Sequence, residues 1–282
     1  MVTLPPKVIL EPLFREWLQE DIGRGDRATD AITETTNPEK NAIWLAKQPG
    51  IIAGLPFAEH IFSLLGEIQW QPQLQEGSFC ENKQEILHCR AQTNTLLSGE
   101  RVALNLVMHL SGIATLTHRY VEQIRDLPVQ LVDTRKTTPG LRLLEKYATQ
   151  IAGATNHRFG LDDAAMVKEN HIQAAGGIKN AIAQVRSSLP YPLTIEVETT
   201  TQAEVAAALE TDVEIIMLDN MSLPLMKKMV SLIRESSKPI KIEASGNITL
   251  ENIRDVALTG VDYISASAPI TQAHWLDLSM KL

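Results

Sequence analysis

The stretch "LTIEVETTTQAEVAAALETDVEIIMLD", residues 193–219, contains the unit from which most of this chain is built. An apolar run is followed by a helical pattern that opens with threonines, and a second apolar run ends at Asp219. Threonine suits a helix start because its hydroxyl can cap a free backbone N–H group. Strands that alternate with helices of this length pair in parallel through right-handed crossovers. The stretch therefore predicts a β-α-β unit of a parallel sheet.

The same rhythm recurs from about Leu127 to the end of the chain. Its apolar runs are "PVQLVD", "DAAMVK", "LTIEVE", "EIIMLD", "IKIEAS" and "DYISAS". They are nearly continuous in aliphatic residues, as strands covered on both faces usually are. About six such units fit, fewer than the eight of a complete barrel. We therefore expect an α/β fold built on an incomplete, about six-unit α/β barrel.

The first part of the chain has a different pattern. The runs "NAIWLAKQPGIIAGL", "IQWQPQLQEG" and "EILHCRAQT" indicate strands separated by Pro-Gly and Glu-Gly turns. A long helical pattern follows over residues 98–124, with Ser98 as its predicted cap. We expect a smaller α+β N-terminal domain over residues 1–115 and the barrel-like catalytic domain over residues 116–282. This division also allows the C-terminal residues to pack with the N-terminal domain.

The composition argues against several classes of partner. The 282 residues include 26 Lys and Arg against 34 Asp and Glu, a formal net charge of −8, which repels a long polyanion such as DNA. Two cysteines, Cys80 and Cys89, cannot form a dense disulfide framework. The most apolar helical stretch, "VALNLVMHLSGIATL", is too short to cross a bilayer. We expect a cytoplasmic protein with no nucleic-acid or membrane partner.

The ends of the predicted strands carry the residues with chemical potential. The carboxyl ends of the strands form the active face of an α/β barrel. Here cations follow the early strands, carboxylates the middle ones, and small hydrogen-bond donors the last two. Any one of these residues is common in a turn, but their joint location predicts an active site. They are Thr134, Arg135 and Lys136; His157 and Arg158; Lys168; Glu198; Asp219; Ser245, Gly246 and Asn247; and Ser265, Ala266 and Ser267.

Two of these positions carry further information. Lys168 ends an apolar run, where lysine is seldom buried without a partner. Glu196 and Glu198 alternate along one strand, so both point to the same face, although one of them could simply pair with a neighbouring helix.

These groups together predict the kind of ligand. Several cations favour a substrate with several anionic groups, and the fork of an arginine matches a carboxylate. Two carboxylates on adjacent strands suit Mg²⁺ held by few protein ligands, or sugar hydroxyls. Glycine and serine turns that lead into helices suit a phosphate monoester. A phosphorylated sugar with a polyanionic partner fits all three groups.

The motifs "DTRKTTPGLR", "NHRFGLDDAAMVKENH", "IEVE", "LDNM" and "EASGNI" together resemble those of the quinolinate phosphoribosyltransferases. The likeness extends to "LLSGERVALNLVMHLSGIAT" and "EDIGRGDRATD", and so covers nearly the whole chain. That family combines quinolinate with phosphoribosyl pyrophosphate and releases pyrophosphate and CO₂ to give nicotinate mononucleotide, a precursor of NAD. It has an incomplete barrel and requires Mg²⁺. The resemblance implies the same fold, activity and cofactor for this chain.

The resemblance also assigns roles to the residues. It implies that the quinolinate site is lined by Arg135, Arg158 and Lys168, with Thr134 and His157 beside them. It implies catalysis by Lys136, Glu198 and Asp219, which would serve the phosphoribosyl pyrophosphate, the two carboxylates holding Mg²⁺ directly or through water. The ribose phosphate would be held by Ser245, Gly246, Asn247, Ser265, Ala266 and Ser267. Ser267 departs from the glycine common in the family, which would weaken a close backbone contact without abolishing function.

A homodimer with shared active sites, or a larger assembly of such dimers, is a further expectation. The resemblance implies that Arg101 completes the quinolinate site of the neighbouring subunit. The predicted helix places Arg101 in its first turn, and the segment "ERVALNLVMHLSGIATL" is apolar nearly all round. An apolar surface larger than a monomer can cover favours packing against a second subunit.

Three alternative functions remain open at this point. A non-carboxylating nicotinate phosphoribosyltransferase has a similar barrel, but its substrate has one carboxylate fewer and needs fewer cations. A Schiff-base aldolase would use Lys168 as its nucleophile. A non-catalytic phosphosugar-binding protein would not need both Glu198 and Asp219.

Overall fold

The computed structural model describes residues 2–282, which divide into two compact units. The first unit comprises the chain up to His118 together with Thr138–Ala152 and Gln272–Leu282. The second unit comprises Arg119–Thr137 and Gly153–Thr271. The division expected from the sequence, 1–115 and 116–282, treats the domains as consecutive segments, whereas these two units interleave.

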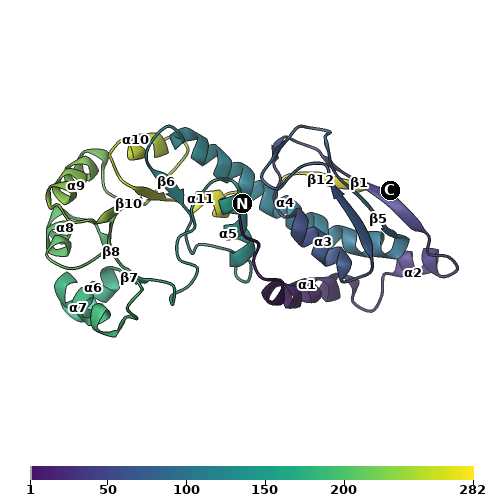
Figure 1. Ribbon diagram of the computed structural model, residues 1–282, viewed down its shortest axis with the longest axis horizontal. Helices are drawn as coiled ribbons and strands as arrows, with labels where there is room; N and C mark the ends of the chain where they lie inside the picture. The colour runs from purple at the N-terminus through teal and green to yellow at the C-terminus, as the bar shows by residue number, and fades with distance from the viewer. Residues whose placement is uncertain (1) are drawn as a thin grey trace. The chain divides into compact units, whose positions relative to one another are not determined.

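The second unit is built on a six-stranded parallel sheet with the strand order β6-β11-β10-β9-β8-β7 (Figure 1). Each of the six predicted apolar runs forms one of these strands. The first and last strands in the order are not paired with each other, so the ring of strands stays open, and the expected incomplete barrel is confirmed. The strands are β6 (Gln130–Val132), β7 (Ala165–Val167), β8 (Ile195–Thr199), β9 (Ile215–Asp219), β10 (Lys241–Ser245) and β11 (Tyr263–Ser265).

The helices from α6 to α10 connect successive strands, α11 follows the last strand, and α7, α8 and α9 lie along the same side of the sheet (Figure 1). Helix α8 begins as predicted, because the Thr201 hydroxyl accepts the Glu204 N–H and the Glu204 carboxylate accepts the Thr201 N–H. These helices are α6 (Glu169–Ala175), α7 (Ile178–Ser188), α8 (Gln202–Leu209), α9 (Leu223–Glu235), α10 (Ile253–Ala257) and α11 (Ala268–Thr271).

The first unit contains a four-stranded antiparallel sheet in the order β12-β1-β5-β3 and a two-stranded sheet formed by β2 and β4. The strands are β1 (Glu39–Ala46), β2 (Gly50–Ile51), β3 (Ile68–Pro72), β4 (Phe79–Cys80), β5 (Glu85–Gln92) and β12 (Leu278–Lys281). Pairing of β12 with β1 returns the C-terminal residues to this unit. Its helices are α1 (Lys7–Ile22), α2 (Arg27–Thr33), α3 (Leu55–Ser63), α4 (Thr93–Ile124), which ends in the second unit, and α5 (Arg142–Ile151).

One face of the four-stranded sheet forms the core of the first unit. Alternation along β1 buries Ala42, Trp44 and Ala46, as the period of two in a strand requires. The Trp44 ring meets Phe62 of α3 edge-on at a centroid distance of 6.3 Å, and Leu96 of α4 packs against the same face. This core holds the first turns of α4 in place.

The predicted start of the long helix is wrong by five residues. Helix α4 begins at Thr93, directly after β5, and the Ser98 hydroxyl donates to the Asp26 carboxylate (3.1 Å) instead of capping the helix. Arg101 therefore lies in the third turn of α4, beyond the region where a helix dipole matters. The argument for a second subunit from the apolar helix is also wrong, because the single chain already buries Val102, Ala103, Leu104, Leu106, Val107 and Leu110.

Among the helices that the structure describes, none has the length and apolar character needed to cross a membrane.

Candidate active site

The parallel sheet brings the predicted strand-end residues of the second unit to one edge. Because all six strands run in the same direction, their carboxyl ends meet there. The strand order sets the arrangement along that edge. The cations that follow β6 come first, and the turns after β11 and β10 come next. Asp219 at the end of β9, Glu198 on β8 and Lys168 after β7 complete the edge. The cations that follow the early strands β6 and β7 therefore lie at the two ends of the edge, with the carboxylates and the small donors between them.

Strand register decides which side chains share a face. Glu198 pairs with Met217, and Asp219 pairs with Ser245. Residues two apart on a strand point the same way, so Glu198, Asp219 and Ser245 lie on one face of the sheet. The same period places Glu196 and Glu243 on that face, one step deeper than Glu198 and Ser245.

Lys168 and Glu198 form an ion pair at the edge, with 2.6 Å between Nζ and the carboxylate oxygen. The Lys168 side chain is 48% exposed and Glu198 is 20% exposed. The expectation that Lys168 is buried within its apolar run is wrong, because the lysine stands beyond the end of β7 at the start of α6. The resemblance assigns Lys168 to the quinolinate site and Glu198 to the sugar and the metal, so this ion pair joins the two expected binding sites.

Arg135 and Arg158 lie close enough to influence each other. Burial lowers the pKa of the Arg158 guanidinium, and the positive charge of Arg135 lowers it further. Arg158 Nη1 donates to the Ala164 carbonyl at 2.7 Å, and the Thr134 hydroxyl accepts the backbone N–H of Lys136 at 3.0 Å. Two guanidinium groups that repel each other make a place suited to a ligand with two negative groups.

The turn after β10, the first of the two predicted phosphate turns, has an unusual backbone. Gly246 and Asn247 have φ values of +96° and +51°, a region that glycine adopts without strain and that asparagine tolerates better than most residues. The second predicted phosphate turn, after β11, is less open. Ser265 and Ala266 are buried, and the Ala266 N–H donates to the Val132 carbonyl at 3.1 Å. Ser267 is the partly exposed member of that turn.

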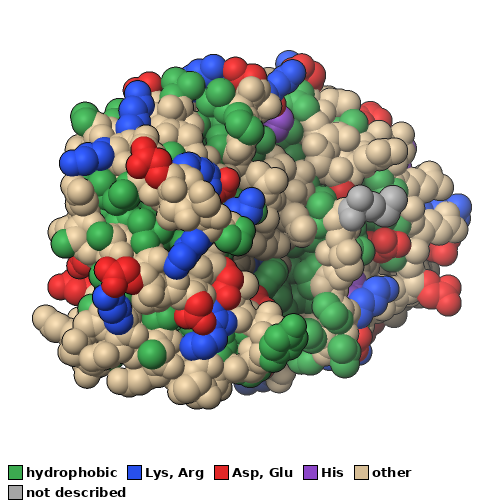
Figure 2. Space-filling view, turned by 60° about the vertical axis from the view of Figure 1, so that its left-hand side comes forward, with side chains coloured by type: hydrophobic (Ala, Val, Ile, Leu, Met, Phe, Trp, Pro, Cys, Tyr) green, Lys and Arg blue, Asp and Glu red, His purple; other side chains and the backbone are tan. Residues whose placement is uncertain are grey.

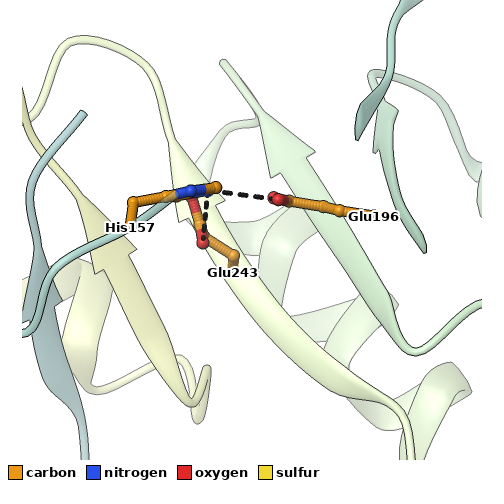
Figure 3. A group of neighbouring side chains, drawn as sticks. All are labelled: His157, Glu196 and Glu243. Carbon is orange, nitrogen blue, oxygen red and sulfur yellow. Dashed lines mark ion pairs between the residues drawn. The ribbon is translucent and has the colours of Figure 1, made fainter. Parts of the chain in front are cut away.

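Beneath this edge, the partly buried His157 lies close to two buried carboxylates, Glu196 and Glu243 (Figure 3). His157 Nε2 is 3.1 Å from a Glu196 oxygen and 3.7 Å from a Glu243 oxygen. Sequence reasoning named His157, treated Glu196 as a possible structural pair, and missed Glu243. The signal for Glu243 was a carboxylate inside the apolar run "IKIEAS", two residues before Ser245.

Hydrogen bonds fix the state of the imidazole. His157 Nδ1 accepts the backbone N–H of Arg158 at 2.7 Å, so the ring proton is on Nε2, which faces the carboxylates. Burial raises the pKa of Glu243, and the nearby Glu196 carboxylate raises it further, while His157 and the Ser265 hydroxyl act in the opposite direction. One oxygen of Glu196 and one of Glu243 are buried without a hydrogen-bond partner.

The three groups also have the spacing of a metal site, since one ligand atom from each lies within 4.8 Å of the others. However, the atom of His157 that would bind the metal is Nε2, and the Nδ1 hydrogen bond keeps the proton there. The arrangement therefore favours an imidazole N–H that faces the two carboxylates over a metal ion.

The remaining predicted residue, Arg101, is exposed on α4 in the first unit. On the face of the molecule shown in Figure 2, Lys and Arg side chains are interspersed with Asp and Glu side chains. An anionic substrate would therefore respond to a local cluster of cations, such as the one after β6, and not to a broad positive field.

Comparison with known proteins gives consistent matches over nearly the whole chain. Residues 26–111 match the family model "Quinolinate phosphoribosyl transferase, N-terminal domain", and residues 113–281 match the corresponding C-terminal domain model. A probable nicotinate-nucleotide pyrophosphorylase [carboxylating] from Synechocystis sp. is 54% identical over 283 residues, covering 100% of this chain and 95% of the relative. The human nicotinate-nucleotide pyrophosphorylase [carboxylating] is 36% identical and covers 100% of this chain and 94% of its own.

A solved structure agrees with these matches. The crystal structure of NadC from Streptococcus pyogenes superposes with a TM-score of 0.94 at 38% identity, covering 99% of this chain and 98% of that one. At 38% identity the two chains share much of their sequence as well as their fold.

Proposed function

The chain belongs to the quinolinate phosphoribosyltransferase family, and we propose that it transfers the phosphoribosyl group of phosphoribosyl pyrophosphate to quinolinate with loss of CO₂. The products are nicotinate mononucleotide, pyrophosphate and CO₂, in a step of NAD biosynthesis. The observation that carries the proposal is the pair Arg135 and Arg158, two mutually repelling guanidinium groups at the edge that also bears Glu198, Asp219 and the turn after β10.

Quinolinate would be held at the arginine end of this edge. Its two carboxylates would take the forks of Arg135 and Arg158, with Thr134 beside them, and Lys168 would contribute from the β7 end of the edge. His157 supports this end from below, because its Nδ1 holds the backbone of Arg158. A dianion relieves the repulsion between the arginines, whereas nicotinate, with one carboxylate, would relieve only part of it.

Phosphoribosyl pyrophosphate would lie along the middle of the edge, with its ribose phosphate at Ser245, Gly246 and Asn247 and toward Ser267. Glu198 and Asp219 share a face at the ends of adjacent strands, and a donor set of two carboxylates with substrate phosphates fits Mg²⁺. When bound, Mg²⁺ would neutralise charge on the diphosphate. Lys136, adjacent to Arg135, would contact the same leaving group.

The Lys168–Glu198 ion pair links the two substrates. Glu198 is only 20% exposed, so opening the pair favours a new partner for its carboxylate, whereas the half-exposed Lys168 can also be solvated by water. A quinolinate carboxylate would serve Lys168, and the sugar and metal would serve Glu198. Binding of the two substrates would therefore open the pair together.

The chemistry follows from this placement. The ring nitrogen of quinolinate forms a bond to C1 of the ribose as the bond from C1 to pyrophosphate breaks. Glu198 or Asp219 would stabilise the positive charge on the sugar, and Lys136 the negative charge on the leaving group. The nitrogen is then a pyridinium, which stabilises the electron pair left on the adjacent ring carbon when its carboxylate leaves as CO₂. That carbon takes up one proton to complete nicotinate mononucleotide.

The active unit would be a homodimer, or a larger assembly of such dimers, in which Arg101 reaches the quinolinate site of the partner. Its exposure on α4 leaves the guanidinium available for such a contact. Mixing inactive Arg101→Ala chains with inactive Lys136→Ala chains tests this. A mixed dimer would contain one intact site, so activity should return after subunit exchange. Activity that stays absent after exchange has been confirmed by mass spectrometry would reject the shared site.

A cytoplasmic location fits the two cysteines, Cys80 and Cys89, which are free and buried. Unpaired thiols are typical of a reducing compartment.

The activity is tested by incubating the protein with quinolinate, phosphoribosyl pyrophosphate and Mg²⁺ and measuring nicotinate mononucleotide, pyrophosphate and CO₂. Equal amounts of the three products are expected, and nicotinate should not replace quinolinate. Product formed from nicotinate without CO₂ would favour the non-carboxylating alternative. Trapping of a carbonyl substrate on Lys168 by borohydride would favour the aldolase.

A further inference from the structure

Asn220, which immediately follows Asp219 at the end of β9, connects two parts of the proposed site. Its Nδ2 donates to the Asp219 carboxylate at 2.7 Å. Its Oδ1 accepts from the Asn247 side-chain amide at 3.0 Å, and its backbone N–H donates to the Ser245 carbonyl at 2.9 Å. One residue thus holds both the carboxylate on β9 and the turn after β10.

The backbone at Asn220 is shaped for this contact. Its φ is +52°, in the left-handed region that asparagine tolerates better than most residues. Gly246 fits closely against it: a Cβ at Gly246 would lie 2.3 Å from Asn220 Oδ1 and 2.9 Å from its backbone nitrogen. The absence of a side chain at Gly246 therefore serves the close approach of Asn220 as well as the positive φ of the turn.

The amide is the chemical group that can make both side-chain contacts. It offers a donor to the carboxylate of Asp219 and an acceptor to the amide of Asn247, so its orientation is fixed by its neighbours. The hydrogen bond to one oxygen of Asp219 restricts the orientations that the carboxylate can adopt. On its other side the turn is held by Asn252, whose Nδ2 donates to the Asn247 carbonyl at 2.8 Å.

We infer that Asn220 is a positioning residue that fixes Asp219 and the Ser245–Asn247 turn relative to each other, and thereby sets the affinity for phosphoribosyl pyrophosphate but not for quinolinate. The inference rests on the proposed function, which places the phosphate and sugar at these two elements. A residue that orients a ligand's protein partners typically changes affinity or activity by about 10- to 100-fold when it is replaced.

Two variants separate positioning from simple packing. Asn220→Gly removes the side chain and keeps the left-handed backbone free of strain. Asn220→Asp keeps the shape and the acceptor toward Asn247, but replaces the donor to Asp219 by an oxygen that repels it. Asn180→Asp makes the same chemical change at an exposed position on α7 and serves as the matched control.

The experiment measures the Kd of quinolinate, and of phosphoribosyl pyrophosphate with Mg²⁺, by titration calorimetry, and the KM for each substrate. We expect both Asn220 variants to weaken phosphoribosyl pyrophosphate by about 10- to 100-fold with the quinolinate Kd unchanged. The control should match the parent. Thermal unfolding checks that each variant is folded.

An Asn220→Asp variant that binds phosphoribosyl pyrophosphate like the parent would overturn the inference, because shape alone would then suffice. Equal weakening of both substrates would also overturn it, since that indicates a general structural role. A parent protein that binds neither substrate would instead reject the proposed function, whatever the variants do.

Discussion

Buried and partly buried carboxylates occur in both units, but their hydrogen-bonding partners differ. In the first unit, Glu76 accepts the backbone N–H groups of Gly54 and Leu55 (2.9 and 2.8 Å) and the Tyr147 hydroxyl (2.8 Å). Both of its oxygens therefore have donors. In the second unit, Glu196 and Glu243 each keep one buried oxygen without a hydrogen-bond partner.

A second carboxylate of the first unit, Glu145, also has a partner for each of its two oxygens. Glu145 is fully buried on α5, where one oxygen lies 2.9 Å from His109 Nε2 and the other accepts the Thr138 N–H at 2.9 Å. Burial alone would raise the pKa of Glu145, but the hydrogen bonds from His109 and Thr138 outweigh it and hold the pKa below its ordinary value.

The contrast indicates where buried polar atoms without partners lower the stability of the fold. A buried polar group with all its partners stiffens a core, whereas one left short of partners costs free energy. The cost in the second unit falls directly beneath the edge with Arg158, Glu198 and Asp219. Local sacrifices of this kind are typical of sites that bind ligands. The predictions below test whether the first unit's carboxylates serve stability and the second unit's groups serve function.

The largest effect is expected from Asp219→Ala. Turnover should fall by about 100-fold or more, because a carboxylate placed where charge develops in the transition state is lost. Quinolinate affinity, measured by calorimetry, should change far less. Glu198→Ala should behave similarly, although it also frees Lys168. Glu235→Ala, an exposed carboxylate at the end of α9, is the control. Normal turnover with lost quinolinate affinity would contradict the division between the two substrates.

Next in size are Arg158→Lys and Arg135→Lys. Lysine keeps the charge but loses the two-pronged fit to a carboxylate, which should cost roughly 1.5–3 kcal/mol of quinolinate binding, or about 10- to 100-fold in Kd. Arg15→Lys, at an exposed position on α1, should leave binding unchanged. Parent-like affinity in both site variants would remove these arginines from the quinolinate site.

A smaller effect, on stability alone, is expected from Glu76→Gln. The Glu76 carboxylate accepts from three donors, and the NH₂ group of a glutamine cannot accept a hydrogen bond. One or more of these hydrogen bonds is therefore lost. The loss should be about 2 kcal/mol, or a fall in Tm of about 4–8 °C. Thermal unfolding measures it, and the quinolinate Kd should stay at the parent value. A parent-like Tm would show that the satisfied network adds little to stability.

Much of the fold could be predicted because its signals are local. All six parallel strands were visible as apolar runs, and Thr201 marked the start of α8 correctly. The start of α4 was missed because its first five residues are held in place by the packing of Leu96 on the sheet. The sequence alone does not reveal that contact. The place of α5 in the first unit depends on long-range bonds of Glu145 and Tyr147 in the same way.

The site was predictable as far as strand ends could be counted. The strand-end residues of the second unit lie at one edge, whereas the shared face of Glu198 and Asp219 depends on the register between strands, which the sequence does not reveal. Glu243 and Asn220 were missed because each acts through a side chain distant in sequence, His157 and Asn247 respectively. The exposure of Lys168 was misjudged because β7 ends one residue before it.

The most direct test of the contrast between the two units is the Glu243→Gln variant at two pH values. The pKa of Glu243 is raised to about 7, so the folded parent binds the extra proton at low pH and loses stability as the pH rises through 7. Glutamine removes that cost. At pH 8 its Tm should exceed that of the parent by about 2–4 °C, the shift that 1 kcal/mol produces in a protein of this size. At pH 5 the advantage should disappear.

The same samples are assayed for kcat/KM toward quinolinate, which should fall because the support of His157 and Arg158 is altered. A variant more stable at pH 8 and less active is the predicted result. A variant that is less stable at pH 8 with unchanged kcat/KM would contradict this interpretation, because Glu243 would then be an ordinary core residue like Glu145.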